Sequence, residues 1–273
     1  MPSTDKRFPV VFLLDFSGSM LGPSRYQNPK IDMMNKFVED FMRMCMDHSK
    51  ARRCTDLSFV LFTDKIVAIT EFRDIRDLGP GVRFEYLEEE YFNEINWKEV
   101  RVDRGERISI PRFWVSKKDN GTDIGNAVRC GIKMIEDRIG AHGGQDQYSP
   151  MLILVTDGHP VAENQYISNR ELANERAAIN KLREHEYTTS DACNLIIPLV
   201  VPVEENRMMG SGSVARLKRY VEHFDAGYLT CDSDREYKNL AFINSILSKS
   251  LDGSTALRNL AQLVQDEPHN SGM

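Results

Sequence analysis

No stretch of this sequence approaches the about 18 uninterrupted apolar residues that a membrane-spanning helix needs. Residues 1–7 are polar, and no apolar segment of signal-peptide length follows them. An excess of basic residues is also missing, because 35 Lys and Arg stand against 41 Asp and Glu, for a net charge of −6. Without that excess the electrostatic attraction that dominates nucleic-acid affinity is lacking. We therefore expect a cytoplasmic protein with no membrane span and no nucleic-acid partner.

Cysteine is scarce as well. The five cysteines are odd in number and scattered, with no CxxC pair and no Cys/His group at zinc spacing. Cys45 and Cys54 are close enough in sequence to pair in principle, but reduced, buried thiols are the favoured interpretation. The 273 residues, 41% hydrophobic and 28% charged, are enough for one α/β domain with insertions or at most two small domains.

Apolar runs alternate along the chain with amphipathic stretches, which is typical of parallel strands joined by helices. We expect a doubly wound α/β fold with helices on both faces of a central, mainly parallel sheet and one antiparallel edge strand. The edge strand is expected to be the second arm of a hairpin. The expected strands are Phe8–Leu14, Leu57–Phe62, Ile66–Thr70, Met151–Thr156, Leu195–Val201 and Gly227–Thr230. The expected helices run from Lys30 to about His48 and over Asp123–Arg138, Asn169–Glu184, Ser213–His223 and Arg235–Lys249.

One segment interrupts this alternation. Residues 78–118 are too many for an ordinary loop, so we interpret them as an insertion with its own hairpin, lying over the edge of the sheet and ending in the alternating stretch 107–115. The domain is then expected over 8–250, with a polar, partly disordered tail over 251–273. Aromatic side chains beside an acidic run favour a contact surface for a partner. The candidate partner-binding residues of the insertion are Glu88, Tyr91, Phe92 and Trp97.

The most informative motif is Asp15-Phe16-Ser17-Gly18-Ser19-Met20, directly after the first apolar run. It places one carboxylate and two hydroxyls at i, i+2 and i+4 on a turn past the carboxyl end of a strand. Ligands of α/β folds bind at that end of the sheet. Oxygen donors around a glycine-containing turn suit a hard cation such as Mg²⁺.

Two later segments bring further oxygen donors. Thr122 lies in Asn-Gly-Thr-Asp-Ile-Gly at the start of an expected helix, where it could also be an ordinary helix cap. Asp157 follows the apolar run Met151–Val155, in the same position relative to its strand as Asp15. The carboxyl ends of parallel strands lie on one edge of the sheet. The candidate metal ligands Asp15, Ser17, Ser19, Thr122 and Asp157 can therefore converge.

In this order the motifs resemble the metal-ion-dependent adhesion site of von Willebrand factor A domains, and the resemblance covers residues 8–250 without the insertion. It implies that Ser17 and Ser19 bind the metal directly, Thr122 directly or through water, and Asp15 and Asp157 mostly through water. Within that family the chain is similar to bacterial intracellular proteins of the tellurite-resistance and stress-response type. This finer similarity rests on three segments, LLDFSGSM, TDGHP and GYLTCDSDREYKNLAFINSILSKSL.

A metal held mainly by neutral hydroxyls stays electrophilic and keeps a position that a partner's Asp or Glu can complete. We therefore expect a divalent-metal-dependent protein–protein interaction module that binds Mg²⁺, Mn²⁺ or Ca²⁺ and is not an enzyme. The resemblance implies an adaptor in bacterial stress response or phage defence, with a kinase or phosphatase of the same pathway as a partner.

Three alternative functions compete with this one. A metal-independent scaffold would bind partners through the 78–118 insertion. A phosphohydrolase of the haloacid dehalogenase type would use Asp15 as nucleophile, but it needs an acid where Ser17 stands, and His159 is the only nearby base. A nucleotide-binding loop at 210–213 lacks the lysine and the third glycine of the known phosphate-binding motifs.

Overall fold

The computed structural model describes residues 6–22, 29–87, 95–102, 105–115, 121–141, 148, 150–157, 177, 197–202 and 227–228. Residue 177, inside the expected helix 169–184, is helical. The rest of that helix, the expected helices 213–223 and 235–249, the loop 210–213 and the tail 251–273 lie outside the described residues.

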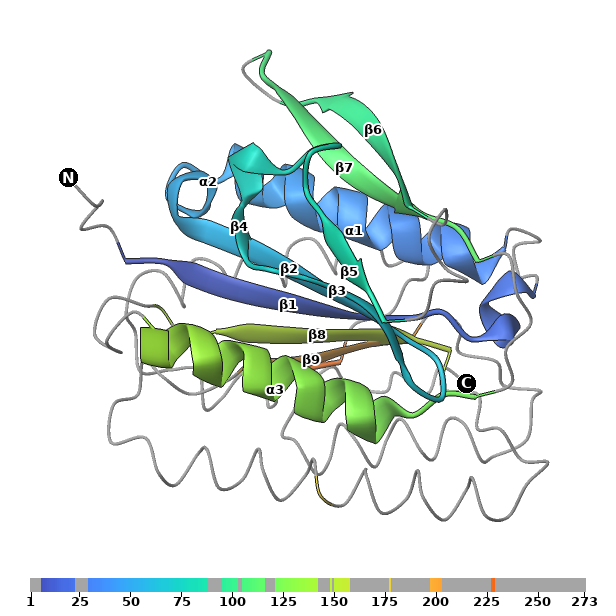
Figure 1. Cartoon of the computed structure of the whole chain (residues 1–273). Helices are drawn as coiled ribbons and strands as arrows, with labels where there is room; N and C mark the ends of the chain where they lie inside the picture. The colour runs from blue at the N-terminus through green and yellow to red at the C-terminus, as the bar shows by residue number, and fades with distance from the viewer. Residues whose placement is uncertain are drawn as a thin grey trace, which may run out of the picture.

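The described part is a mixed α/β structure around one central sheet, with the strand order β10-β9-β8-β1-β2-β3-β5 (Figure 1). The pairs from β10 to β2 are all parallel, and β3 pairs antiparallel with β2. The short β4 also pairs antiparallel with β2, and a separate hairpin joins β6 to β7. The strands are β1 Phe8–Asp15, β2 Thr55–Phe62, β3 Ile66–Thr70, β4 Arg73–Asp74, β5 Phe84–Tyr86, β6 Ile95–Arg101, β7 Arg107–Phe113, β8 Met151–Thr156, β9 Ile197–Pro202 and β10 Gly227–Tyr228.

The prediction that Ile66–Thr70 forms the edge of the sheet was wrong. The far side of β3 pairs with β5 in antiparallel register, Ala68 opposite Tyr86 and Thr70 opposite Phe84. The edge strand therefore comes from the segment interpreted as an insertion. Its three residues are too few to show a strand periodicity in the sequence.

Strand β1 is buried over its whole length because both of its faces are covered. Its side chains alternate between the faces, as the two-residue period of a strand requires. Phe8, Val10, Phe12 and Leu14 lie in the larger core cluster with helix α1, and Val11 and Leu13 lie in the second cluster with helix α3. The continuous apolar run that predicted a central strand is thus confirmed.

Helices α1 (Lys30–Asp47) and α3 (Ile124–Ala141) cover opposite faces of the sheet (Figure 1). The predicted apolar stripe of α1 is confirmed, and every member is buried. The stripe comprises Ile31, Met34, Phe37, Val38, Phe41, Met42 and Cys45. Shorter helical elements are α2 (Ala51–Cys54), η1 (Gly18–Leu21) and η2 (Ile75–Asp77).

The expected hairpin of the insertion is present as β6 and β7, and it lies alongside α1 (Figure 1). The amide side chain of Asn35 on α1 forms two hydrogen bonds with the backbone of Phe113, each 2.8 Å long. The Phe113 ring contacts Phe84 of the edge strand, with the centroids 6.4 Å apart. The hairpin therefore joins α1 to the edge of the sheet, and its contact with α1 adds to the predicted position over the edge.

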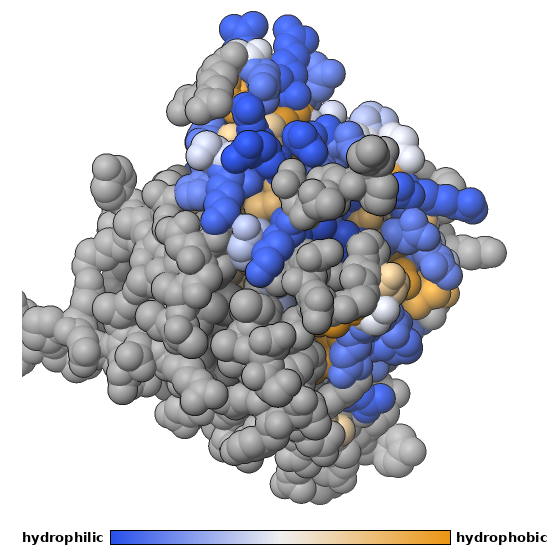
Figure 2. Space-filling view, turned by 90° about the vertical axis from the view of Figure 1, so that its left-hand side faces the viewer, coloured by the Kyte–Doolittle hydropathy of each residue, from blue (hydrophilic) through white to orange (hydrophobic). Residues whose placement is uncertain are grey.

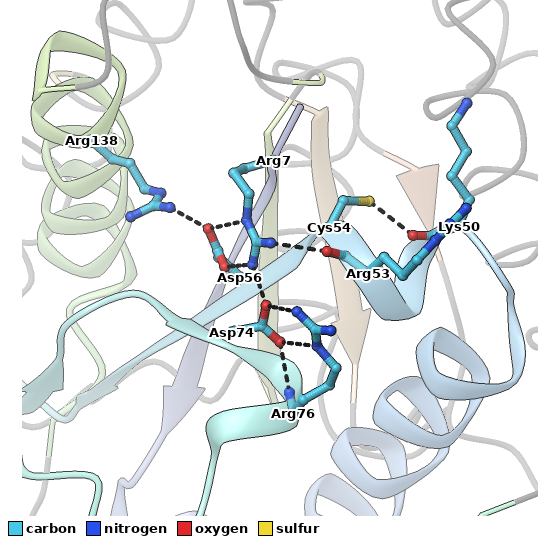
Figure 3. A network of polar contacts seen from close by, with 8 residues as sticks. All are labelled: Arg7, Lys50, Arg53, Cys54, Asp56, Asp74, Arg76 and Arg138. Carbon is cyan, nitrogen blue, oxygen red and sulfur yellow. Dashed lines mark hydrogen bonds and ion pairs between the residues drawn. The ribbon is translucent and has the colours of Figure 1, made fainter. Parts of the chain in front are cut away.

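An ion-pair network ties the amino ends of β1 and β2 to α3 and β4 (Figure 3). Arg7 donates to the buried Asp56 and, at 2.8 Å, to Asp74, while Arg138 of α3 donates to Asp56 from the other side. Arg76 donates to Asp74 at 2.7 Å. Figure 2 shows the left-hand side of the view in Figure 1, and the described surface on that side is mostly hydrophilic.

The cysteines inside the described ranges agree with the expectation of reduced thiols, since none of Cys45, Cys54 and Cys130 forms a disulfide. Among the described residues, no helix combines the length and the apolar character needed to cross a membrane.

Candidate metal centre

Asp15 ends β1 and is completely buried. Its carboxylate accepts a 2.8 Å hydrogen bond from the backbone N–H of Ser17 and a 2.5 Å bond from the hydroxyl of Thr156, the last residue of β8. The chain then turns beside β2, where the Phe16 N–H donates to the Phe62 carbonyl. The two oxygens of Asp15 thus connect the turn after β1 with the end of β8.

The two serines of the motif lie together. The Oγ atoms of Ser17 and Ser19 are 2.9 Å apart, within hydrogen-bonding distance. Ser17 is buried and precedes the 3₁₀ turn η1, while Ser19 is half-buried within it. Two hydroxyl oxygens therefore lie next to each other just past Asp15.

Asp157 directly follows β8, at the same edge of the sheet as Asp15. Its Oδ2 accepts a 2.9 Å hydrogen bond from the ammonium of Lys30, the first residue of α1, in a buried ion pair. Burial raises the pKa of the Asp15 carboxyl to about 7, and the negative charge of Asp157 adds to that rise. The edge thus carries two buried carboxylates close enough to repel each other.

Thr122 is buried next to the end of β2, because the N–H of its neighbour Asp123 donates to the Thr63 carbonyl at 2.7 Å. The possibility that Thr122 caps the following helix was wrong. The cap is Asp123, whose Oδ1 accepts the N–H of Asn126 at 2.9 Å, and α3 begins at Ile124. Gly121 allows this close approach, because a Cβ there would lie 2.2 Å from the Cβ of Asp64.

All five predicted ligands therefore lie at the carboxyl ends of β1, β2 and β8. Sequence reasoning missed two neighbours of the site, Lys30 and Thr156. Thr156 could have been noticed as the residue before Asp157. Lys30 could not be recognised from the sequence, because 127 positions separate it from Asp157.

The donors have the right chemistry for a hard divalent cation, because all of them are oxygens. In the described ranges no three His, Cys, Asp or Glu side chains come together in a way that could hold a metal, so binding would depend on the hydroxyls beside the two carboxylates. The Lys30 ammonium on Asp157 shows that this edge already attracts positive charge.

The expected partner surface is described only in part. Glu88, Tyr91 and Phe92 lie outside the described residues, and Trp97 on β6 is partly buried against the core. Two apolar side chains that the sequence analysis did not name are exposed instead, Trp114 at 61% and Leu87 at 51%. Trp114 follows Phe113, whose ring contacts Phe16 of the motif at a centroid distance of 5.9 Å.

No protein-family model and no curated protein matches the chain. Among solved structures it is similar to proximal thread matrix protein 1 of the mussel byssus, at 17% identity and a TM-score of 0.41, over 92% of this chain and 49% of that one. It is also similar to the pilus adhesin SpaC of Lactobacillus rhamnosus GG, at 13% identity and a TM-score of 0.43, over 95% of this chain and 31% of that one. The chain spans about half of the first structure and about a third of the second. Similarities at this level carry no conclusion about family or function.

Proposed function

We propose that the chain is a divalent-metal-dependent protein-binding domain of the von Willebrand factor A type. In this proposal the sheet is the doubly wound sheet of that family, and the ligand set is Asp15, Ser17, Ser19, Thr122 and Asp157. The observation that carries the proposal is the turn after β1, where two serine hydroxyls lie 2.9 Å apart beside the fully buried Asp15.

Each residue has a distinct part in this proposal. Ser17 and Ser19 offer hydroxyl oxygens, and Thr122 is a third hydroxyl donor at the same edge of the sheet. Asp15 is oriented by the Ser17 N–H and the Thr156 hydroxyl, and Asp157 adds the second negative charge. When bound, Mg²⁺, Mn²⁺ or Ca²⁺ supplies an open coordination position that an Asp or Glu of a partner protein completes.

The biological setting is proposed from the resemblance in sequence. LLDFSGSM and TDGHP are similar to segments of bacterial tellurite-resistance and stress-response proteins. On that basis we propose a non-enzymatic cytoplasmic adaptor in stress response or phage defence, with a kinase or phosphatase among its partners. A serine at position 17 leaves an aspartyl-phosphatase mechanism without its acid, which supports the absence of catalysis.

The proposal is tested first by metal binding. Mg²⁺ and Mn²⁺ are titrated calorimetrically into the wild type, into Asp15→Ala and into Asp137→Ala, a matched control that removes an exposed carboxylate on α3. We expect binding by the wild type and the control and none by Asp15→Ala, with both variants still folded by circular dichroism. Failure of the wild type to bind either ion would refute the metal site.

A second experiment tests the partner. The same three proteins capture partners from bacterial lysate with Mg²⁺ or with EDTA. A partner retained by the wild type and by Asp137→Ala only with Mg²⁺ supports the adaptor function. Equal capture in every condition would instead favour the metal-independent scaffold, for which the exposed Trp114 and Leu87 of the 78–118 segment are the supporting observation.

A further inference from the structure

Lys30 is an unusual residue for its position. Lysine is almost never fully buried unless it is paired. Here its side chain is only 8% exposed, and its Nζ lies 2.9 Å from Oδ2 of Asp157, whose side chain is 1% exposed. A buried ammonium loses its water, and the carboxylate of Asp157 replaces part of that solvation.

The charges around Lys30 explain why an ammonium is favoured there. Asp15 and Asp157 are both buried, and their mutual repulsion is part of what raises the pKa of Asp15. A cation beside Asp157 reduces the negative charge of the pair. A divalent cation on the neighbouring oxygens would do the same, but the two cations would repel each other strongly at short range and low dielectric.

We propose that Lys30 is a built-in counter-ion of the metal site, which neutralises Asp157 in the metal-free protein and must withdraw from Asp157 when a divalent ion binds. The inference rests on the proposed function, since it concerns the same ligand set. Lys30 is then a residue that sets metal affinity without being a ligand.

The position of Lys30 gives the exchange a structural consequence. It is the first residue of α1, and its backbone N–H donates to the Gly22 carbonyl just after η1, at 3.2 Å. The ion pair with Asp157 therefore connects the start of α1 to the end of β8. Withdrawal of the side chain breaks that connection, so metal binding loosens the first turn of α1 from the sheet edge.

The first test compares Lys30→Met, which keeps the length of the aliphatic stem and removes the charge, with Lys36→Met. Lys36 is a matched control on the same helix, 57% exposed and paired with Asp40. Mg²⁺ and Mn²⁺ are titrated into each protein after removal of bound metal. We expect Lys30→Met to bind Mg²⁺ at least about tenfold more tightly than the wild type, and Lys36→Met to bind it equally.

The outcomes separate this inference from the proposed function. Equal or weaker binding by Lys30→Met, with normal binding by the wild type, would overturn the counter-ion role and leave the metal site standing. Absence of binding by both proteins would overturn the metal site and this inference with it.

A second measurement uses the wild type alone, so it does not depend on how the variant folds. An amine-reactive acylating reagent labels the protein with EDTA or with saturating Mg²⁺, and mass spectrometry quantifies the label at Lys30 and at Lys36. We expect Mg²⁺ to increase labelling of Lys30 several-fold and to leave Lys36 unchanged. Unchanged labelling of Lys30 in a protein that binds Mg²⁺ would show that it stays on Asp157 and would refute the exchange.

Discussion

At the scale of single residues, the candidate site depends on contacts that fix its oxygens before any ion binds. Asp15 accepts hydrogen bonds from two different parts of the chain, the turn after β1 and the end of β8. Its orientation is therefore set by the fold. A preorganised ligand loses less conformational freedom when a metal binds. The hydrogen bonds that orient Asp15 therefore contribute to metal affinity together with the ligands themselves.

Gly121 is the residue whose replacement should disturb the site without removing a ligand. A Cβ there would lie 2.2 Å from the Asp64 Cβ and 3.0 Å from its backbone N, so Gly121→Ala must shift the loop that carries Thr122. We expect Mg²⁺ affinity to fall by roughly tenfold or more, as for other changes that displace metal ligands. Calorimetric titration measures the change.

The control for this substitution is Gly81→Ala, because no atom lies within 4 Å of a Cβ at that position. It should bind Mg²⁺ like the wild type. If Gly121→Ala also binds Mg²⁺ like the wild type, the position of Thr122 does not contribute to metal binding.

At the scale of secondary structure, the close contact between α3 and the sheet depends on one glycine. A Cβ on Gly131 would lie 2.5 Å from Cδ1 of Leu152 on β8 and 3.0 Å from Cδ2 of Leu13 on β1. The helix therefore approaches two central strands so closely that an added methyl group would force the ends of these leucine side chains to move. Gly140, near the end of the same helix, has open space around it.

These two glycines predict opposite effects of alanine. We expect Gly131→Ala to destabilise the protein by about 1–3 kcal/mol through overpacking. Gly140→Ala should stabilise it by up to about 1 kcal/mol, because alanine favours the helix. Urea unfolding followed by circular dichroism measures both. A stabilised Gly131→Ala would show that α3 or the two leucine side chains can shift at little cost.

The elements that the sequence predicted well are those with strong apolar patterns. The bounds of β3 and β8 agree with the expected ranges, and β1, α1 and α3 differ from theirs by a few residues at most. Among the elements that escaped prediction, strands β4 and β5 have two and three residues, and such lengths show no period. The capping residue of α3 was assigned to Thr122 instead of Asp123, because both Thr and Asp can form the capping hydrogen bond and the sequence does not show which one does.

At the scale of the whole molecule, the candidate site and the ion-pair network lie at opposite ends of the same strands. The site follows Asp15 at the carboxyl end of β1, and Arg7 precedes the amino end of that strand. The first location was predictable because the Asp15 and Asp157 motifs each follow a recognisable apolar run. The network could not be predicted, because its partners Arg7, Asp56, Asp74 and Arg138 meet only in the folded chain.

This network predicts how stability depends on acidity. Although burial alone would raise the pKa of Asp74, hydrogen bonds from Arg76 and Arg7 lower it to about 2. The charged form is thus favoured in the folded state, and its contribution is complete above the ordinary pKa near 3.8 and disappears as the pH falls toward 2. We expect Asp74→Asn to cost about 1 kcal/mol above pH 4 and progressively less below it.

Urea unfolding of both proteins between pH 2.5 and pH 6 measures this difference. Asp137→Asn, which removes a carboxylate from the exposed pair with Lys133, is the control and should not reproduce the pH dependence. A cost of Asp74→Asn that stays constant down to pH 2.5 would mean that the arginines do not favour the charged carboxylate.

The order of strands in the sheet also determines when the protein can complete its fold during synthesis. Strand β1 lies between β2 and β8, yet residues 63–150 separate the end of β2 from the start of β8. At about 5–20 residues per second, a ribosome needs on the order of ten seconds to add that stretch. Throughout this interval one hydrogen-bonding edge of β1, which is apolar from Phe8 to Leu14, has no strand beside it. The nascent chain therefore carries an unpaired strand edge, a site for chaperones or for misassembly, until β8 has left the ribosome.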